Sequence, residues 1–477
     1  MTLCIMVRKE KIMLKKITAA FLGCAMIFGM TACTQTDAPP AETTIDDDIF
    51  NPVDVSGIDL DNKPKDVDIK GKKIKYLGCY DITTAGDIKP AVKYLEQNYE
   101  ASIECEIVGD SAIMETLATY ISNGMSPDLV DRRSNSFPYY ALLNSYEPLD
   151  DYIDLNKPQW ADVKSVIDGY AIDGKHYYYP WTYYMCDRVL VYNEGKFKEF
   201  GIKDPKELWD NNEWTWDAFR DCMAQFVTKA QNDVPDAIGV YGSFGNTFIN
   251  TTGVPLVGFE DGKLVSHLED SNIDRAQTFL FNLKKEGLSR LTYGDYGTVS
   301  NEPVINGSAA FMSMGDWILP GFAEDEEKNG GDHNFVPMPR DPQSDKYNYT
   351  LGTFGYLVPS GASNTQAAAV FIDCVRSSHL DKEMQAVIAE SVKKSKHYTD
   401  EWYDWLDYFQ NMDNFKPDQL VSDFAYSLDT DTTNNVISKI CEDIPFVEND
   451  EITSWTAMRE SYKPMLDDSI SKINQGQ

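Results

Sequence analysis

The chain has 477 residues, of which 42% are apolar and 25% charged, so it is long enough for two or three folded units with buried cores. Asp and Glu (76) outnumber Lys and Arg (43), which gives a formal net charge of −33 at pH 7. This acidity argues against a protein that binds nucleic acid or anionic lipid through charge. Because the histidines are few and no Cys-x-x-Cys pair occurs, we expect no metal and no cofactor.

The first 33 residues have the pattern of an export signal. Two lysines precede an apolar run from 17 to 30, and Cys33 follows two small residues. A basic start, a short apolar run and small residues before the cleavage site are typical of a secretory signal, and the run is shorter than the ~20 residues of a spanning helix. The cysteine resembles that of the bacterial lipoprotein box. We therefore expect a lipoprotein signal peptide over 1–32 and a lipid on Cys33, which would hold the protein on the extracytoplasmic face of the cell membrane.

The stretch 33–70 is predicted to be a disordered acidic tether. It is rich in Asp, Thr and Pro and has few large apolar residues. Such a composition buries too little surface to offset chain entropy. We expect the tether to hold the folded body away from the membrane.

The folded body begins with alternating strand and helix patterns. Strands are expected near 73–80, 103–107 and 129–130, with amphipathic helices at 88–99 and from 111 onward. This order predicts a parallel sheet covered by helices. Ligands of such sheets bind at the carboxyl ends of the strands. The polar side chains at these ends include those of Tyr80, Asp81, Arg132 and Asn135.

A second α/β unit is expected to begin near Val189. Strand patterns lie at 190–192 and 237–241, and helix patterns at 214–229 and from 271 onward. The tail from 381 onward has the aromatic and apolar spacing of helices.

Nine short motifs carry a resemblance to a known family: Ser126-Pro-Asp-Leu-Val130, Glu147-Pro-Leu-Asp-Asp-Tyr152, Asp173-Gly-Lys-His-Tyr177, Leu190-Val-Tyr-Asn193, Trp214-Thr-Trp-Asp-Ala-Phe219, Asn306-Gly-Ser-Ala-Ala-Phe-Met312, Gly315-Asp-Trp317, Val336-Pro-Met-Pro339 and Phe354-Gly-Tyr-Leu-Val-Pro359. The chain resembles extracellular solute-binding protein family 1, the substrate-capture lipoproteins of ABC importers, which are similar in plan to maltose-binding protein. The motifs run in family order across about 72–375.

The resemblance implies a two-lobed, periplasmic-binding-protein-like α/β fold of type II. Each lobe would have a parallel sheet with helices on both faces, and a hinge would join the lobes beside a cleft. We expect the first lobe to comprise 71–183 and 311–353. The second lobe would comprise 184–310 and 354–477, including the helical tail. Crossings between the lobes are expected near 180–189, 310–315 and 352–358.

The resemblance also implies where a ligand would bind. Trp317 would stack on a sugar ring, with Asp316 accepting hydrogen bonds from hydroxyl groups, although core packing of Trp317 is an alternative. Arg132 could instead be a surface counter-charge, and Phe244 could equally belong to the core. The candidate ligand-binding residues are Tyr80, Asp81, Arg132, Asn135, Trp181, Tyr184, Phe244, Asp316, Trp317 and Phe354.

By this resemblance, the protein captures a carbohydrate, preferably an oligosaccharide, and as a monomer delivers it to the permease subunits of an ABC importer. No phosphate-binding loop, Gly-x-Ser-x-Gly elbow or His-Glu-x-x-His motif occurs in the sequence, so we expect no enzyme. Two alternatives stay open. One is a lipid-anchored carbohydrate hydrolase, because acidic residues are abundant enough for a catalytic pair. The other is a binding protein for a cationic solute such as a polyamine.

Overall fold

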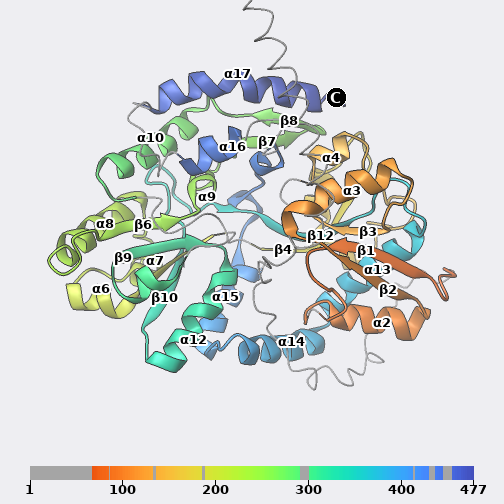
Figure 1. The fold of residues 1–477 in the computed structure, drawn as a ribbon, viewed down its shortest axis with the longest axis horizontal. Coiled ribbons are helices and arrows are strands. Elements are labelled where there is room, and N and C mark those ends of the chain that lie inside the picture. Colours follow the sequence, from red (N-terminus) through yellow and green to blue (C-terminus); the bar gives the residue numbers. More distant parts are fainter. Residues whose placement is uncertain are drawn as a thin grey trace, which may run out of the picture. The chain divides into compact units, whose positions relative to one another are not determined.

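The computed structural model describes residues 67–84, 86–132, 136–184, 188–289, 300–411, 414–428, 436–443 and 454–476 (Figure 1). These ranges belong to one compact body, Ile45–Gln477. Within it, we call the five-stranded sheet with its covering helices the first unit and the four-stranded sheet with its covering helices the second unit. The predicted signal peptide, Cys33 and the tether up to residue 66 lie outside them. The described chain is mixed α/β, with a five-stranded sheet, a four-stranded sheet and two small two-stranded sheets.

The five-stranded sheet has the order β2-β1-β3-β12-β4. Its first three strands run parallel, as predicted, whereas β12 runs antiparallel to both β3 and β4. The sheet is therefore mixed rather than purely parallel. The strand bounds are β1 Lys73–Gly78, β2 Ser102–Ile107, β3 Leu129–Asp131, β4 Tyr178–Tyr184 and β12 Gly352–Leu357.

Helices cover both faces of this sheet because side chains alternate along its strands. Tyr76 packs into a core with α2 (Lys89–Tyr99) and α13 (Thr365–Leu380). The next residue, Leu77, packs into the other core with α3 (Ile113–Ser122). The carboxyl ends of β1 and β3 are thereby held at one edge of the sheet.

The four-stranded sheet has the order β10-β5-β9-β6, in which β6 is parallel to β9 and β5 is antiparallel to both of its neighbours. Its strands are β5 Val189–Asn193, β6 Ile238–Gly242, β9 Ala309–Met314 and β10 His333–Pro337. On one face, Phe219 of α8 (Trp216–Ala230) contacts Phe311 of β9 at a ring distance of 5.2 Å. On the other face, Trp402 of α15 (Asp400–Gln410) contacts Phe335 of β10 at 5.5 Å.

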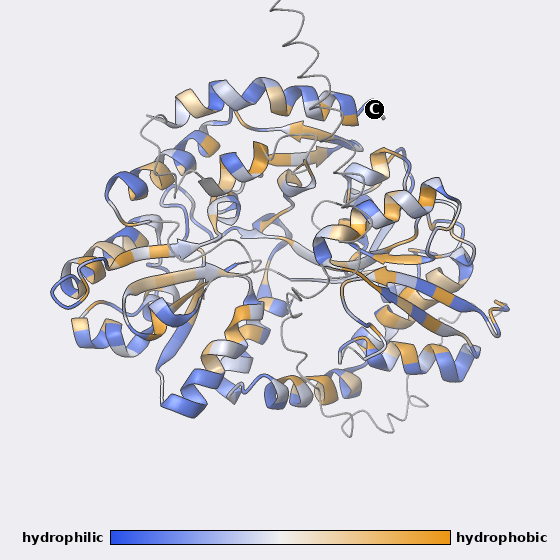
Figure 2. Cartoon of the chain, in the orientation of Figure 1, coloured by the Kyte–Doolittle hydropathy of each residue, from blue (hydrophilic) through white to orange (hydrophobic). Residues whose placement is uncertain are grey.

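Local sequence explains why α8 forms where it does. The hydroxyl of Thr215 accepts a hydrogen bond from the backbone N–H of Ala218 and caps the first turn. The buried side chains of Trp216, Phe219, Met223 and Phe226 then recur every three or four residues, so they form one apolar face. Figure 2 shows hydrophobic residues along the central strands and alternating hydrophobic and hydrophilic residues along outer helices.

The sheets correct the predicted boundaries between the lobes. The segment 309–337, which contains β9 and β10, lies in the four-stranded sheet although 311–353 was assigned to the first lobe. Conversely, β12 and α13 pack in the first unit although 354–477 was assigned to the second. The predicted crossings near 310–315 and 352–358 are strands β9 and β12 themselves. An apolar run marks a strand but not the sheet that it joins, so neither the resemblance nor the pattern placed these segments correctly.

The tail beyond residue 380 is largely helical, as predicted, and contacts both units. Met384 and Ile388 of α14 (Lys382–Ser395) join the core of the first unit, whereas α15 joins that of the second. Helix α17 (Trp455–Ile473) packs on α10 (Ser271–Lys285), where Arg459 donates to both oxygens of Asp274 at 2.8 Å. Among the described residues, no helix has the combined length and hydropathy of a membrane span.

Candidate functional site

Aromatic side chains with exposed or half-buried rings lie on either side of the point where the chain passes from the first sheet to the second. Tyr184 ends β4, and four residues later Arg188 directly precedes β5. Four residues span at most about 14 Å. Because Val189 pairs with Met314, the segment that follows β9 and carries Trp317 starts beside this crossing. Side chains of both units therefore flank one short connection; β4 lies near the middle of Figure 1.

On the first unit, three aromatic rings form a stack. Phe354 of β12 lies 6.1 Å from Trp181 and 4.7 Å from Tyr184 between ring centroids, with interplanar angles of 15° and 24°. Trp181 and Tyr184 would point to opposite faces of a regular strand. However, the register shifts between Phe354 and Gly355, which leaves Trp181 as the extra residue of a β-bulge. The bulge brings both rings to Phe354.

The three rings of this stack differ in exposure. Trp181 is 7% exposed and contacts the buried ring of Tyr356, whereas Phe354 is 48% exposed. Trp181 therefore supports the stack from the core side, and Phe354 and the half-buried Tyr184 offer the surface that a solute can reach.

On the second unit, Trp317 is 51% exposed, so it is a surface ring and not a core residue. It belongs to the short 3-10 turn that directly follows β9. The guanidinium carbon of Arg188 lies 5.2 Å from the centroid of its ring. The neighbouring Asp316 is half-buried and accepts a hydrogen bond of 3.4 Å from the Nε2 of Gln410 in α15.

At the carboxyl end of β1, Tyr80 is 42% exposed. The carboxylate of the next residue, Asp81, is already hydrogen-bonded. Its Oδ1 accepts from the N–H of Thr83 (2.8 Å), the hydroxyl of Thr83 (2.7 Å) and the thiol of Cys105 (3.3 Å). Although partial burial opposes ionisation, these hydrogen bonds lower the pKa of Asp81. Its carboxylate thus holds the loop that presents Tyr80.

Arg132 follows β3 and is half-buried. Its N–H donates to the carbonyl of Gly355 at 3.1 Å, and its guanidinium lies 5.8 Å from the centroid of the Tyr178 ring. Tyr178 belongs to an aromatic cluster with Phe137 and Tyr170. Arg132 therefore packs on this cluster and is more than a surface counter-charge. Asn135, which was predicted beside it, lies outside the described residues.

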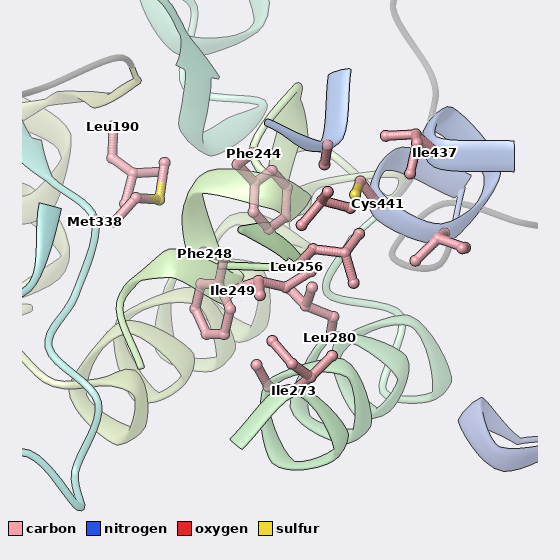
Figure 3. Close-up of a cluster of buried hydrophobic side chains, with 14 of the residues drawn as sticks. Leu190, Phe244, Phe248, Ile249, Leu256, Ile273, Leu280, Met338, Ile437 and Cys441 are labelled. Atoms are coloured by element: carbon pink, nitrogen blue, oxygen red, sulfur yellow. The ribbon is translucent and has the colours of Figure 1, made fainter. Parts of the chain in front are cut away.

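Besides Trp181, which is nearly buried, the structure places one further candidate ligand contact in the core. Phe244 is 1% exposed and lies among the apolar side chains of the second unit, including Phe248, Ile249 and Leu256 (Figure 3). A solute cannot reach this ring without unpacking the core. An apolar residue just after a strand has the same sequence signature whether it faces the core or the ligand, which is why the sequence left both roles open for Phe244.

Arg188 and Gly315, which adjoin Trp317, were not predicted. An arginine ahead of a strand carries no distinctive sequence signal. The glycine before Asp316 and Trp317 was visible as part of a motif, but its contact with the ring was not.

Within the described ranges, no group of three or more His, Cys, Asp or Glu side chains is arranged to hold a metal ion.

Behind the carboxyl edge of the first sheet lies a buried polar pair. The hydroxyl of Tyr76 donates to Oδ2 of Asp131 at 2.7 Å, and both side chains are at most 5% exposed. Burial raises the pKa of Asp131 to about 7 despite this hydrogen bond. Burial likewise raises the pKa of Asp373, which accepts from Gln159, to about 6.

These two carboxyl groups predict that mild acidification stabilises the protein. Their folded pKa values lie above the unfolded value of 3.8, so the folded chain binds these protons at a higher pH than the unfolded chain. The stability that these two carboxyl groups contribute to the folded protein therefore increases as the pH falls through about 7 and 6, and decreases as the pH rises. Below about 6.5, His379 opposes the trend, because burial and Arg376 lower its pKa to about 4. The melting temperature should be higher at pH 6.5 than at pH 8.

The variant Asp131→Asn tests this account of the pH dependence. Its amide oxygen can still accept from Tyr76 but carries no charge at any pH, so the difference in melting temperature between pH 6.5 and pH 8 should shrink. Asp151→Asn, at an exposed carboxylate, is the control and should keep the full difference. A wild-type melting temperature that is equal or higher at pH 8 would contradict the assignment.

Two α/β units with mixed sheets, joined by the short connection between β4 and β5 with exposed aromatic rings on either side, define the class of two-lobed solute-binding proteins. Residues 90–391 match the family of bacterial extracellular solute-binding proteins. Because this match covers more than half of the chain, the chain belongs to that family.

Relatives and solved structures agree with this membership. The chain is 29% identical over 112 residues to the diacetylchitobiose-binding protein DasA of Streptomyces coelicolor, a match that covers 24% of this chain and 25% of that protein. The fold is similar to that of the sugar-binding protein MalE from Xanthomonas citri (TM-score 0.63, 17% identity, 84% of this chain and 98% of that chain). It is also similar to a galacto-N-biose/lacto-N-biose I-binding protein of Bifidobacterium longum (TM-score 0.59, 15% identity, 84% and 97%).

Proposed function

We propose that the protein captures a carbohydrate, preferably an oligosaccharide, and delivers it to an ABC import permease without chemically changing it. The observation that carries this proposal is Trp317: a half-exposed indole beside the crossing between the two units, covered by Arg188 on one side. A sugar presents an apolar face of C–H groups and a polar rim, so an open aromatic ring with neighbouring carboxylates and amides suits it. The relatives' names support the proposal, because DasA, MalE and the Bifidobacterium protein are each named for a sugar.

Neighbouring groups are proposed to supply complementary contacts. The half-buried Asp316 would accept hydrogen bonds from ring hydroxyls beside Trp317. On the other side of the crossing, the stacked rings of Phe354 and Tyr184 are proposed as a second apolar surface for the same solute. Two aromatic surfaces on two units favour a ligand with more than one ring. Tyr80 and Arg132, at the carboxyl edge of the first sheet, are proposed as polar contacts at the rim.

A sugar-binding protein, a hydrolase and a polyamine-binding protein are separated by one pair of assays. Full-length protein in non-ionic detergent is titrated with diacetylchitobiose, maltotriose, mannotriose and spermidine while tryptophan fluorescence is followed, and the same mixtures are assayed for released sugars. Saturable quenching or enhancement by a sugar with no hydrolysis supports the proposal. Turnover would favour a hydrolase, and a response to spermidine alone would favour a cationic ligand.

The membrane attachment is proposed to depend on Cys33, from which the tether leads to the folded body. The tether ends earlier than the predicted residue 70, because Ile69 is 3% exposed and packs in the core of the first unit. Cys33→Ala removes the thiol that would carry the lipid. We expect the variant to leave the membrane fraction or to accumulate unprocessed, as followed by cell fractionation and incorporation of a labelled fatty acid. Cys79→Ala, in the folded body, is the control and should stay at the membrane. Unchanged lipid labelling of Cys33→Ala would rule out this anchor.

A further inference from the structure

The ring of Trp317 has two close neighbours at the end of the β5–β9 ladder. Val189 pairs with Met314 in antiparallel register, so Arg188 and Gly315, one step further out, lie opposite each other. The guanidinium of Arg188 is 5.2 Å from the centre of the Trp317 ring. Arg188 is only 6% exposed, whereas Trp317 is 51% exposed. The buried cation therefore lies over one face of an indole that is half exposed.

Gly315 provides the space in which the ring lies. Its backbone angles, φ −67° and ψ 162°, are extended and open to any residue, so a glycine is not required by the backbone. A Cβ at this position, however, would lie 1.7 Å from Cζ3 and 2.1 Å from Cη2 of Trp317. The indole thus folds back across the main chain where only a glycine leaves room for it.

The first unit repeats this arrangement across the crossing. A Cβ at Gly352 would lie 2.2 Å from Cζ of Tyr184, which is its cross-strand partner in the β4–β12 ladder. Aromatic rings on both sides of the crossing are therefore laid against glycines. Among the glycines of the exposed loops, Gly109 shows the contrast, because a Cβ there would meet nothing within 4 Å.

We propose that Arg188 and Gly315 are positioning residues that fix the orientation of Trp317 before a solute arrives. The inference rests on the proposed function, in which Trp317 is the stacking surface. A cation over one face of the ring attracts the ring through its quadrupole. The missing Cβ of Gly315 lets the ring lie flat against the main chain. A ring that is already fixed loses less conformational freedom on binding, so the entropic cost of ordering it subtracts less from the binding free energy.

Ligand-free protein tests the positioning directly. Full-length protein is labelled with 5-fluorotryptophan, and its fluorine resonance for Trp317 is assigned with Trp317→Phe. Gly315→Ala and Arg188→Met should each shift or broaden this resonance, and Arg188→Lys, which keeps the charge, should restore part of the wild-type position. Gly109→Ala is the matched control and should leave the resonance unchanged. An unaltered Trp317 resonance in both Gly315→Ala and Arg188→Met would overturn the proposal.

Calorimetric titration with diacetylchitobiose, maltotriose and mannotriose then shows through which residue Arg188 acts. Arg188→Met should weaken binding by about two- to tenfold, and should cause no further loss in the Trp317→Ala background. Equal losses in both backgrounds would contradict a positioning role. If none of these sugars binds while the Trp317 resonance responds as expected, the proposed carbohydrate function fails and the positioning of the ring stands.

Discussion

Replacing Trp317 with alanine is expected to weaken sugar binding by roughly thirtyfold to thousandfold, equivalent to about 2 to 4 kcal/mol. The reason is that the half-exposed indole is the largest open aromatic surface beside the crossing. Its removal would delete the face on which a sugar ring stacks. Folding should suffer less, because half of the side chain is already in contact with water. Calorimetric titration with the sugar that responds most strongly in the fluorescence assay measures the loss.

Tyr152→Ala is the control for this variant. Tyr152 is also exposed, at 43%, but it lies in the loop that follows β3 and α4 (Tyr139–Leu142). The Tyr152→Ala variant should bind sugar with unchanged affinity. If Trp317→Ala instead lowers the melting temperature sharply while each folded molecule keeps normal affinity, the indole serves packing and the assignment of the site is wrong.

The second large effect is expected at Arg376 of α13, a fully buried arginine. Its guanidinium donates to the carbonyl of Gln159 at 2.7 Å and to the carbonyl of Trp181 at 2.5 Å, and it also pairs with Asp162. Trp181 is the extra residue of the β-bulge, so this arginine satisfies a carbonyl in an irregular part of the ladder. It thereby ties helix α13 to the strand that carries the aromatic stack.

Arg376→Met should lower the free energy of unfolding by about 3 kcal/mol, because it leaves buried carbonyl groups without their charged donor. Urea unfolding followed by circular dichroism measures the change. Arg220→Met is the matched control: Arg220 pairs with Glu286 on the surface, and exposed pairs contribute at most about 1 kcal/mol. Equal unfolding midpoints for the two variants would show that the buried network does not stabilise this unit.

Much of the fold was predictable because it follows from local patterns. Alternating strands and amphipathic helices gave the parallel arrangement of β1, β2 and β3 with helices on both faces. The path of β9, β10 and β12 was not predictable, since an apolar strand can complete either sheet and only tertiary packing decides between them. The β-bulge at Trp181 escaped prediction for the same reason: it exists only in the pairing with β12.

The candidate site was predictable to the extent that a motif marked it. The Gly315-Asp-Trp317 motif placed an aromatic ring just after a strand, and the structure shows that this ring is exposed. The role of Phe244 could not be decided from the sequence because burial depends on which elements pack over a residue. Arg188 was missed because its role depends on the register of β5 against β9. Contacts that join distant segments carry no signature in either segment.

We expect a sugar to bind between the two units at the crossing and to draw them together. This closure can be measured by small-angle X-ray scattering of the full-length protein in detergent-matched buffer, with and without a saturating sugar from the titration panel. We expect the radius of gyration to decrease on binding with no change in oligomeric state, and Trp317→Ala to show no decrease at the same sugar concentration. A sugar that binds tightly to the wild type and leaves its scattering curve unaltered would contradict this closure, because a ligand held by both units must favour their closed arrangement.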